Sequence, residues 1–218
     1  MLTTQKIKKY FIFERSFKNN LYLCTIMPRV IEFNEQKIIS KALQVFWKKG
    51  YYATSMKDLV EATGLNPGSL YNTFGNKHDL FLACLKDYLN PIYAYDLKQK
   101  ETQKNPLELL REFYMEVATN SVLSQDSCLS VKTSFELAAT DDETHQVLKN
   151  SMDKLFEIFE QMVINAQKAG VINDKQDTFS LAQLIVATLP GLGQNFILYK
   201  DKKRIAKIID DLLDMITR

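Results

Sequence analysis

The stretch from Thr54 to Phe74 constrains the fold most, because its residues predict two short helices joined by a tight turn. The first helix begins after a Thr-Ser pair that can cap it, and apolar residues follow at helical spacing. Gly64 ends this helix, as glycine does where the backbone needs a positive φ. Asn66 can cap the second helix, with Pro67 at its first position, where a missing N–H costs nothing. This order predicts a helix-turn-helix, whose second helix enters the major groove of DNA.

The surrounding sequence carries more positions of one pattern, in register from Phe46 to Phe81. They are Phe46, Gly50, Tyr51, Thr54, Ser55, Leu59, Ala62, Gly64, Leu65, Gly68, Ser69, Leu70, Tyr71, Phe74, Lys77, Leu80 and Phe81. The segment from about residue 33 to residue 85 therefore resembles the DNA-binding domain of TetR-type transcriptional regulators. The segment Val60-Glu61-Ala62 departs from the Ile-Ala pair that many members carry earlier in the helix, and this leaves the resemblance intact.

Periodicity along the rest of the chain predicts an all-α fold with no strand. We expect helices over 34–49, 106–121, 128–139, 141–168 and 178–199, and a last helix capped by Asp201. A further helix should open at Lys77, and Pro91 should kink it or start a new segment. The resemblance implies three parts: an N-terminal extension (1–32), a three-helix helix-turn-helix DNA-binding domain (33–80), and a helical effector-binding and dimerisation domain (81–218).

Composition limits the class of protein. The chain of 218 residues is 46% hydrophobic with 7 Gly and 5 Pro, so it is neither disordered nor rich in loops. No apolar run reaches about 18 residues, so we expect no contact with a membrane. The three cysteines are odd in number and widely spaced, which favours a reducing cytoplasm over a disulfide framework.

Charge is distributed unevenly along the chain. Residues 27–90 carry eight Lys/Arg and six Asp/Glu, whereas residues 91–218 carry 15 and 19. The N-terminal third is therefore the better candidate for a surface that faces phosphates. Residues 1–26 carry five Lys/Arg and one Glu. They indicate either an upstream start codon or poorly ordered arm, or a basic arm that adds phosphate contacts.

Candidate DNA-binding residues come from both the resemblance and the chemistry of side chains near helix N-termini. Ser55 and Lys57 can reach phosphates, as can the Tyr71 hydroxyl and Lys77 at the start of the next helix. Asn72 can hydrogen-bond an adenine edge. The full set is Thr54, Ser55, Lys57, Asn66, Gly68, Ser69, Tyr71, Asn72, Thr73 and Lys77. The recognition helix has no Arg, so we expect weaker base contacts and DNA shape to set specificity.

The helix predicted over 178–199 is apolar nearly all round, which is typical of a helix buried on both sides. The resemblance implies that the last two helices of each subunit form a four-helix bundle at a two-fold axis. The predicted dimer interface is Leu189, Leu192, Gly193, Phe196, Ile205, Ile208, Ile209 and Leu212. A kinked core helix is the alternative interpretation.

Aromatic residues of the C-terminal part can line a cavity for a small apolar effector: Tyr93, Phe113, Tyr114, Phe135, Phe156 and Phe159. Each is also a plausible plain core residue. The stretch from Cys128 to Ala138 resembles the "GCLxxNTxxELA" segment of an electrophile- and oxidant-responsive branch, with Ser127 and Lys132 as departures. A thiolate of Cys128 at a helix N-terminus would suit an electrophilic effector. An inert buried thiol is the alternative.

Enzyme activity has no support in the motifs. His78 and His145 are the only histidines, and neither belongs to a metal or triad pattern. We expect no enzyme, cofactor or metal. The leading hypothesis is a dimeric repressor that an effector or thiol modification releases from a palindromic double-stranded DNA operator. The alternative is a helical ligand-binding or interaction protein that does not bind an operator.

Overall fold

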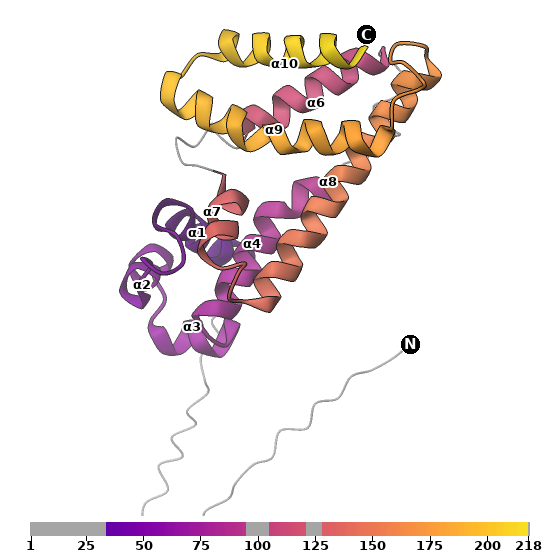
Figure 1. The fold of residues 1–218 in the computed structure, drawn as a ribbon. Helices are drawn as coiled ribbons and strands as arrows, with labels where there is room; N and C mark the ends of the chain where they lie inside the picture. The colour runs from indigo at the N-terminus through magenta and orange to yellow at the C-terminus, as the bar shows by residue number, and fades with distance from the viewer. Residues whose placement is uncertain (1–33, 95–104, 121–127, 218) are drawn as a thin grey trace, which may run out of the picture. The chain divides into compact units, whose positions relative to one another are not determined.

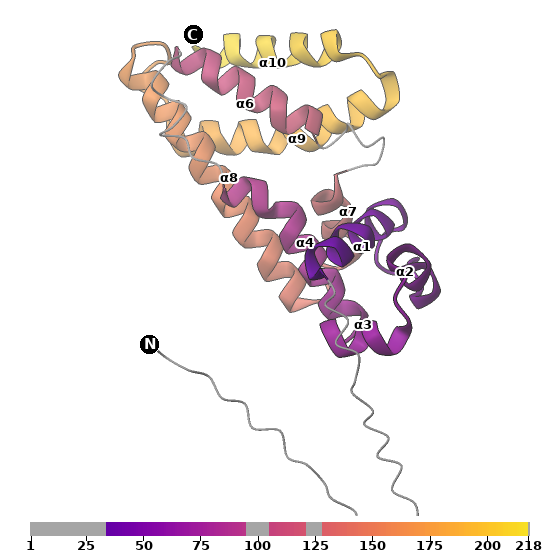
Figure 2. The same ribbon diagram turned by 180° about the vertical axis from the view of Figure 1, so that it is seen from behind.

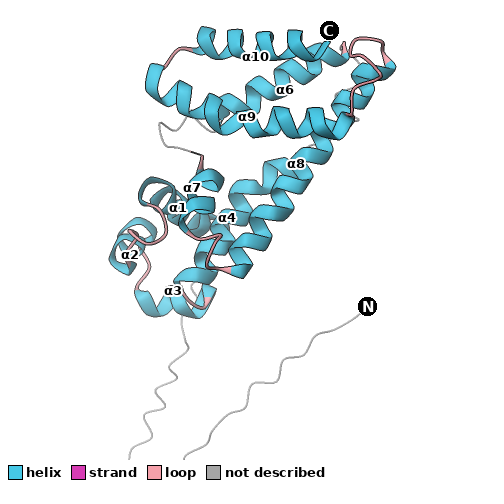
Figure 3. Ribbon diagram, viewed as in Figure 1, coloured by secondary structure: helices cyan, strands magenta, loops and turns pink. Residues whose placement is uncertain are grey.

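The computed structural model describes residues 34–94, 105–120 and 128–217. Within these ranges the chain forms helices and short connections without a strand (Figure 3), which confirms the all-α prediction. The helices, labelled in Figure 1, are α1 (Glu35–Lys49), α2 (Met56–Thr63), α3 (Pro67–Phe74), α4 (Lys77–Tyr93), α6 (Pro106–Asn120), α7 (Leu129–Glu136), α8 (Asp142–Lys168), α9 (Thr178–Tyr199) and α10 (Lys202–Thr217). The predictions for residues 1–32 and Cys24 lie outside the described residues.

Local capping explains where the first four helices begin. The side chains of Asn34, Ser55, Asn66 and Asn76 each accept hydrogen bonds from backbone N–H groups in the first turn that follows. Gly64 ends α2 in the left-handed conformation with φ 76°, so the turn before α3 has the geometry that its glycine predicts.

An aromatic core joins α1 to α4. Phe46 is fully buried, and its ring lies 5.0 Å from that of Phe81 and 6.3 Å from that of Tyr51, measured between centroids. Leu59 of α2 and Leu70 of α3 are also buried. Because these apolar side chains point inward, α2 and α3 are held on α1 and α4 with their polar faces outward.

Helix α8 is the longest and contacts helices of both halves of the described chain (Figure 2). It packs against α6 and α9, which together with α10 form the C-terminal core, and also against α4 and α7. The predicted domain boundary at residue 80 falls inside α4, which contacts both α1 and α8. Helix α4 therefore links the two halves physically.

Three details differ from the sequence-based expectations or extend them. Helix α7 ends at Glu136 instead of 139, and a turn over 137–140 leads to α8. Pro91 lies in the last turn of α4, which continues only to Tyr93. Helix α9 has the length and hydropathy of a membrane span by composition alone, but one of its sides packs against α6, α8 and α10. This packing is that of a core helix.

Candidate DNA-binding surface

The outward face of α3 is small and polar. Gly68, Tyr71 and Asn72 are exposed, Ser69 and Thr73 are half-buried, and Leu70 anchors the helix from beneath. The Oδ1 atom of Asn66 accepts the N–H of Ser69 at 2.8 Å, which fixes the first turn. The predicted recognition residues of α3 therefore share one accessible surface. Such a surface suits an approach to base edges, because Gly68, Ser69, Asn72 and Thr73 are small and polar.

The start of α2 carries a second group of polar residues. Ser55 and Asp58 form a reciprocal capping box, and Asp58 pairs with Lys49 at 2.6 Å. The hydrogen bond from Lys49 and those from Ser55 lower the pKa of Asp58. Lys57, one residue earlier, is exposed. This end of α2 therefore presents one cation and a helix N-terminus whose acidic residue is already paired.

Thr54 needs correcting as a DNA contact. Its side chain is only 1% exposed, and its Oγ1 donates a hydrogen bond to the carbonyl of Gly50 at 2.6 Å. The hydroxyl is therefore committed to the turn between α1 and α2 and does not lie on the surface. The role that the structure supports for Thr54 is to hold the backbone that leads into α2.

Lys77 contacts the same turn from α4. Its Nζ donates to the carbonyl of Tyr51 at 2.6 Å and lies 4.4 Å from the centroid of the Tyr51 ring. Partial burial lowers the pKa of Lys77. An ammonium has three donors, so Lys77 can hold Tyr51 and still offer an N–H to a phosphate. The sequence predicted only the phosphate contact and not the hydrogen bond to Tyr51.

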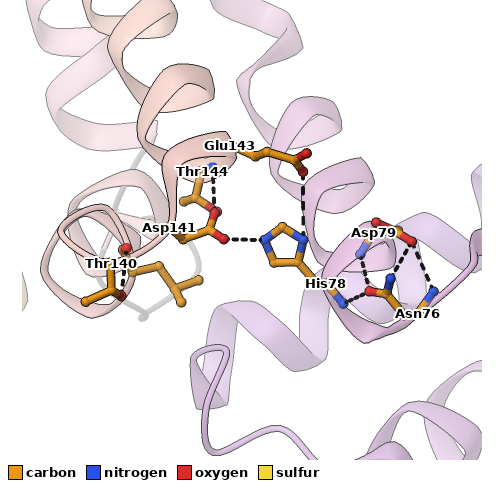
Figure 4. A network of polar contacts seen from close by, with 8 residues as sticks. Asn76, His78, Asp79, Thr140, Asp141, Glu143 and Thr144 are labelled. Carbon is orange, nitrogen blue, oxygen red and sulfur yellow. Dashed lines mark hydrogen bonds and ion pairs between the residues drawn. The ribbon is translucent and has the colours of Figure 1, made fainter.

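A polar network at the start of α4 reaches α8 (Figure 4). Asn76 and Asp79 cap α4 reciprocally, and His78 points away from them toward the start of α8. The Nε2 atom of His78 lies 2.9 Å from Oδ2 of Asp141, and its Nδ1 lies 3.9 Å from Glu143. The hydrogen bond with Thr144, followed by that with His78, lowers the pKa of Asp141. His78 therefore ties α4 to the cap of α8.

Helix α7 makes contacts that the sequence reasoning missed. The carboxylate of Glu136 accepts the N–H groups of Tyr51 at 3.0 Å and Tyr52 at 2.7 Å, and Lys132 Nζ donates to the carbonyl of Trp47 at 2.6 Å. A signal was present, because Glu136 is the glutamate of the "ELA" segment and Lys132 is one of its departures. Its partners lie about 85 positions earlier, however, so spacing alone did not indicate them.

Comparison with known proteins decides the family. A model of the bacterial regulatory proteins of the tetR family matches residues 38–84, and one of the tetracyclin repressor-like C-terminal domain matches residues 106–212. The chain belongs to the TetR family. It is therefore a transcriptional regulator, and α2–α3 is its helix-turn-helix for DNA binding.

Two relatives show how far the likeness extends. The HTH-type transcriptional repressor ComR of Escherichia coli (strain K12) is 28% identical over 169 residues, which cover 76% of this chain and 80% of ComR. The uncharacterised HTH-type regulator YezE of Bacillus subtilis (strain 168) is 27% identical over 157 residues, covering 71% and 80%. The similarity thus includes the C-terminal helices as well as the helix-turn-helix.

Solved structures share the fold at lower identity. A TetR family regulator from Cytophaga hutchinsonii superposes with a TM-score of 0.72 at 21% identity, covering 84% of this chain and 94% of its own. A cysteine mutant of the TetR family regulator CifR, complexed with a 26-bp double-strand operator DNA, superposes with a TM-score of 0.71 at 22% identity. The match covers 84% of this chain and 96% of the CifR chain. The described helices therefore share their arrangement with the regulator from Cytophaga hutchinsonii and with CifR.

Half of the predicted dimer interface needs correcting. Leu192, Ile205, Ile209 and Leu212 are buried against the chain's own α6, α8 and α9. These side chains stabilise the C-terminal core and are not accessible to a partner. Of the other predicted residues, Ile208 is exposed, and Leu189, Gly193 and Phe196 are half-buried. The exposed large apolar side chains of α9 and α10 are Phe179, Leu184, Leu198, Tyr199, Ile208 and Met215.

The predicted effector residues fall into two groups. Phe113, Tyr114 and Phe159 are buried together, with ring centroids 5.1 Å apart for Phe113–Phe159 and 6.0 Å for Tyr114–Phe159. Phe156 is half-buried and packs against this core. Phe135 needs correcting, because it is 89% exposed on α7 and lines no interior with the others. Tyr93 is exposed at the end of α4.

Cys128 is half-buried and is the N-cap residue of α7. Its Sγ lies 3.4 Å from the hydroxyl of Tyr88 and 2.9 Å from that of Ser130. Cys84, by contrast, is fully buried, and burial raises the pKa of its thiol to about 12. Cys84 is therefore protonated and shielded at neutral pH, so of the two described cysteines Cys128 is the more accessible.

Proposed function

We propose that this chain is a dimeric repressor that binds a palindromic operator through α3 and leaves it when an effector binds. The observation that carries the proposal is the exposed polar face of α3, capped by Asn66 and seated on α2 and α4 by Leu70. The repressor name of ComR and the operator complex of CifR support it. A protein with this role acts in the cytoplasm, in contact with DNA.

In the proposed complex the start of α3 lies in the major groove. Asn72 hydrogen-bonds an adenine edge, while the Tyr71 hydroxyl and Lys57 contact phosphates on either side. Positively charged groups contribute affinity that falls as salt rises. Because α3 has no Arg or Lys, its base contacts are few, and DNA shape contributes to the choice of site.

The exposed apolar face of α9 and α10 supports a two-fold dimer. Gly191 lies in a helix next to Pro190, and a Cβ placed on it would meet no atom within 4 Å. Neither packing nor backbone conformation within the chain requires a glycine there. A glycine on an exposed helix surface permits close approach of another backbone, which suits a second copy of α9. A dimer also gives two α3 helices, as a palindromic operator requires.

The proposed effector is small and apolar or electrophilic. The buried aromatic residues between α6, α8 and α9 form an apolar environment, and the hydroxyls of Tyr114 and Thr188 bond to each other within it. A ligand that inserts there must bind the state that releases DNA more tightly than the state that holds it. An electrophile would instead modify Cys128, whose contact with Tyr88 connects α7 to α4.

The test is fluorescence anisotropy of the purified chain on the DNA upstream of its own gene, before and after treatment with a thiol-reactive electrophile. Salt-sensitive binding that treatment abolishes, and that a Cys128→Ser variant retains, supports release through the thiol. Binding that the electrophile leaves unchanged supports a non-covalent effector. A chain that binds no DNA from its own or other promoters refutes the proposal.

A further inference from the structure

We propose that Glu136 is a positioning residue for operator recognition, which holds the helix-turn-helix in one orientation relative to α7 and α8. The inference rests on the proposed function, because it assigns a role in binding the operator. Glu136 itself lies outside the candidate DNA surface, on a helix that follows α6 in the chain. Its effect on DNA therefore has to pass through the residues that it contacts.

The contact is a carboxylate held by two successive backbone N–H groups. Both oxygens of Glu136 are used, Oε2 for Tyr51 and Oε1 for Tyr52. Hydrogen bonds to a charged acceptor are stronger than those between neutral groups, and two of them fix direction as well as distance. These N–H groups belong to the turn between α1 and α2, three to four residues before the cap of α2.

Gly50 shows that the turn is shaped around this carboxylate. Its φ is 80°, and a Cβ built on it would lie 2.7 Å from Oε2 of Glu136. Any side chain at this position would both strain the backbone and displace the carboxylate. The glycine that ends α1 is therefore also the residue that leaves room for Glu136.

A second contact from the same helix prevents rotation about the first. Lys132, one turn earlier on α7, donates to the carbonyl of Trp47 at the end of α1. From α4, Lys77 donates to the carbonyl of Tyr51. Two lysines thus bind the carbonyls of Trp47 and Tyr51, and Glu136 binds the N–H groups of Tyr51 and Tyr52. We therefore expect α2 and α3 to keep one orientation while these hydrogen bonds persist.

In a dimer this orientation has a measurable consequence. The distance between two recognition helices must match the separation of the two half-sites, which one helical turn of DNA sets at about 34 Å. If Glu136 fixes each helix-turn-helix, the dimer will discriminate strongly between operators whose half-sites are closer together or further apart. Without the Glu136 carboxylate, each helix-turn-helix can adjust, and that discrimination will weaken.

The charge of Glu136 and its positioning role predict opposite effects on operator binding, so the two can be told apart. A Glu136→Gln variant lacks one negative charge that repels the phosphates of DNA. Charge alone therefore predicts that the variant binds every duplex more tightly than wild type does. Positioning predicts the opposite for the operator. The matched control is Glu157→Gln, which removes a carboxylate from an exposed position of α8.

The experiment first enriches an operator from a randomised duplex library with the wild-type chain. The dissociation constants of wild type, Glu136→Gln and Glu157→Gln are then measured for that operator, for versions with one or two base pairs added at its centre, and for a scrambled duplex. Hydrogen exchange of the Tyr51 and Tyr52 amides is measured on the same proteins without DNA.

We expect Glu136→Gln to weaken operator binding about tenfold, to reduce the penalty for added base pairs, and to leave scrambled DNA bound equally or more tightly. The amides of Tyr51 and Tyr52 should exchange about tenfold faster in the variant. This factor corresponds to a decrease of about 1.4 kcal/mol in the free energy that protects these amides from exchange. Unchanged amide exchange, or unchanged spacing preference, overturns the inference. Failure of the wild type to enrich any duplex overturns the proposed function and the positioning role together, whatever the amides show.

Discussion

Gly68 allows folding and DNA binding to be separated in one substitution. It lies in the first turn of α3, exposed, and a Cβ placed there would have the Oδ1 atom of Asn66 at 3.4 Å as its only close neighbour. Nothing within the chain therefore requires a glycine. Replacing a helical glycine by alanine stabilises a protein by about 0.5–1 kcal/mol. For a chain of this length, this raises the melting temperature by about 1–4 °C.

DNA binding should change in the opposite direction. If the start of α3 lies against base edges, the added methyl of a Gly68→Ala variant enters a closely packed contact, and overpacking costs about 1–3 kcal/mol. This corresponds to about 5–150-fold weaker operator binding. The assays are thermal unfolding by circular dichroism and anisotropy on the enriched operator. A variant that melts higher and binds the operator as tightly as wild type would refute the placement of α3, and one that melts lower would refute the analysis of Gly68.

Three further predictions follow from the same structure. Gly191→Ala should weaken the dimer by about 5–150-fold through overpacking of a helix contact, measured by sedimentation, and an unchanged monomer–dimer equilibrium would place the interface elsewhere. Lys57→Ala should reduce the steepness of log affinity against log salt by about 0.9 for each phosphate that the lysine neutralises, and it should leave the melting temperature unchanged. Lys77→Ala should reduce both the steepness of the salt dependence and the melting temperature, because Lys77 also holds the α1–α2 turn. In a Cys24→Ser background, a maleimide should label Cys128 rapidly and Cys84 only as the chain unfolds; rapid native labelling of Cys84 would contradict its burial.

The helix-turn-helix was predictable because its determinants are local. Asn66, Pro67 and Gly64 define the turn through their own backbone preferences and caps, and the structure places each helix end where these residues predict. The long helices followed from periodicity for a similar reason. Helix α7 was predicted three residues too long, because its end depends on the turn toward α8 and not on a helix-stopping residue.

The partners of the last two helices were not predictable, because an apolar stripe does not show whether the chain's own helices or a second copy covers it. In α10, Ile205 and Ile209 are buried while Ile208 between them is exposed, and the side chain type is the same in all three. Only the position of α6 and α9 beside α10 decides which isoleucine faces the core. The prediction therefore assigned to a dimer interface several residues that the chain buries against its own helices.

The contacts between α7 and the helix-turn-helix could not be predicted for a different reason. Glu136 and Tyr51 are 85 residues apart, and neither residue type suggests the other. A carboxylate that binds backbone N–H groups requires no particular residue type at the positions that donate them, because every residue except proline has that group. Thr54 shows the same limitation, since its hydroxyl bonds a carbonyl in place of the surface position that the motif suggested.

The most direct test of the central claim, that α3 reads base pairs of a two-fold site, is to repeat the library enrichment with an Asn72→Ala variant. The wild-type chain should enrich two related half-sites in inverted orientation. The variant should enrich the same half-sites with the preference relaxed at one base pair in each, at symmetric positions, since removing a hydrogen bond to a base costs about 1–3 kcal/mol there. Identical sequence preferences for wild type and variant, or no enriched sequence for the wild type, would contradict the account.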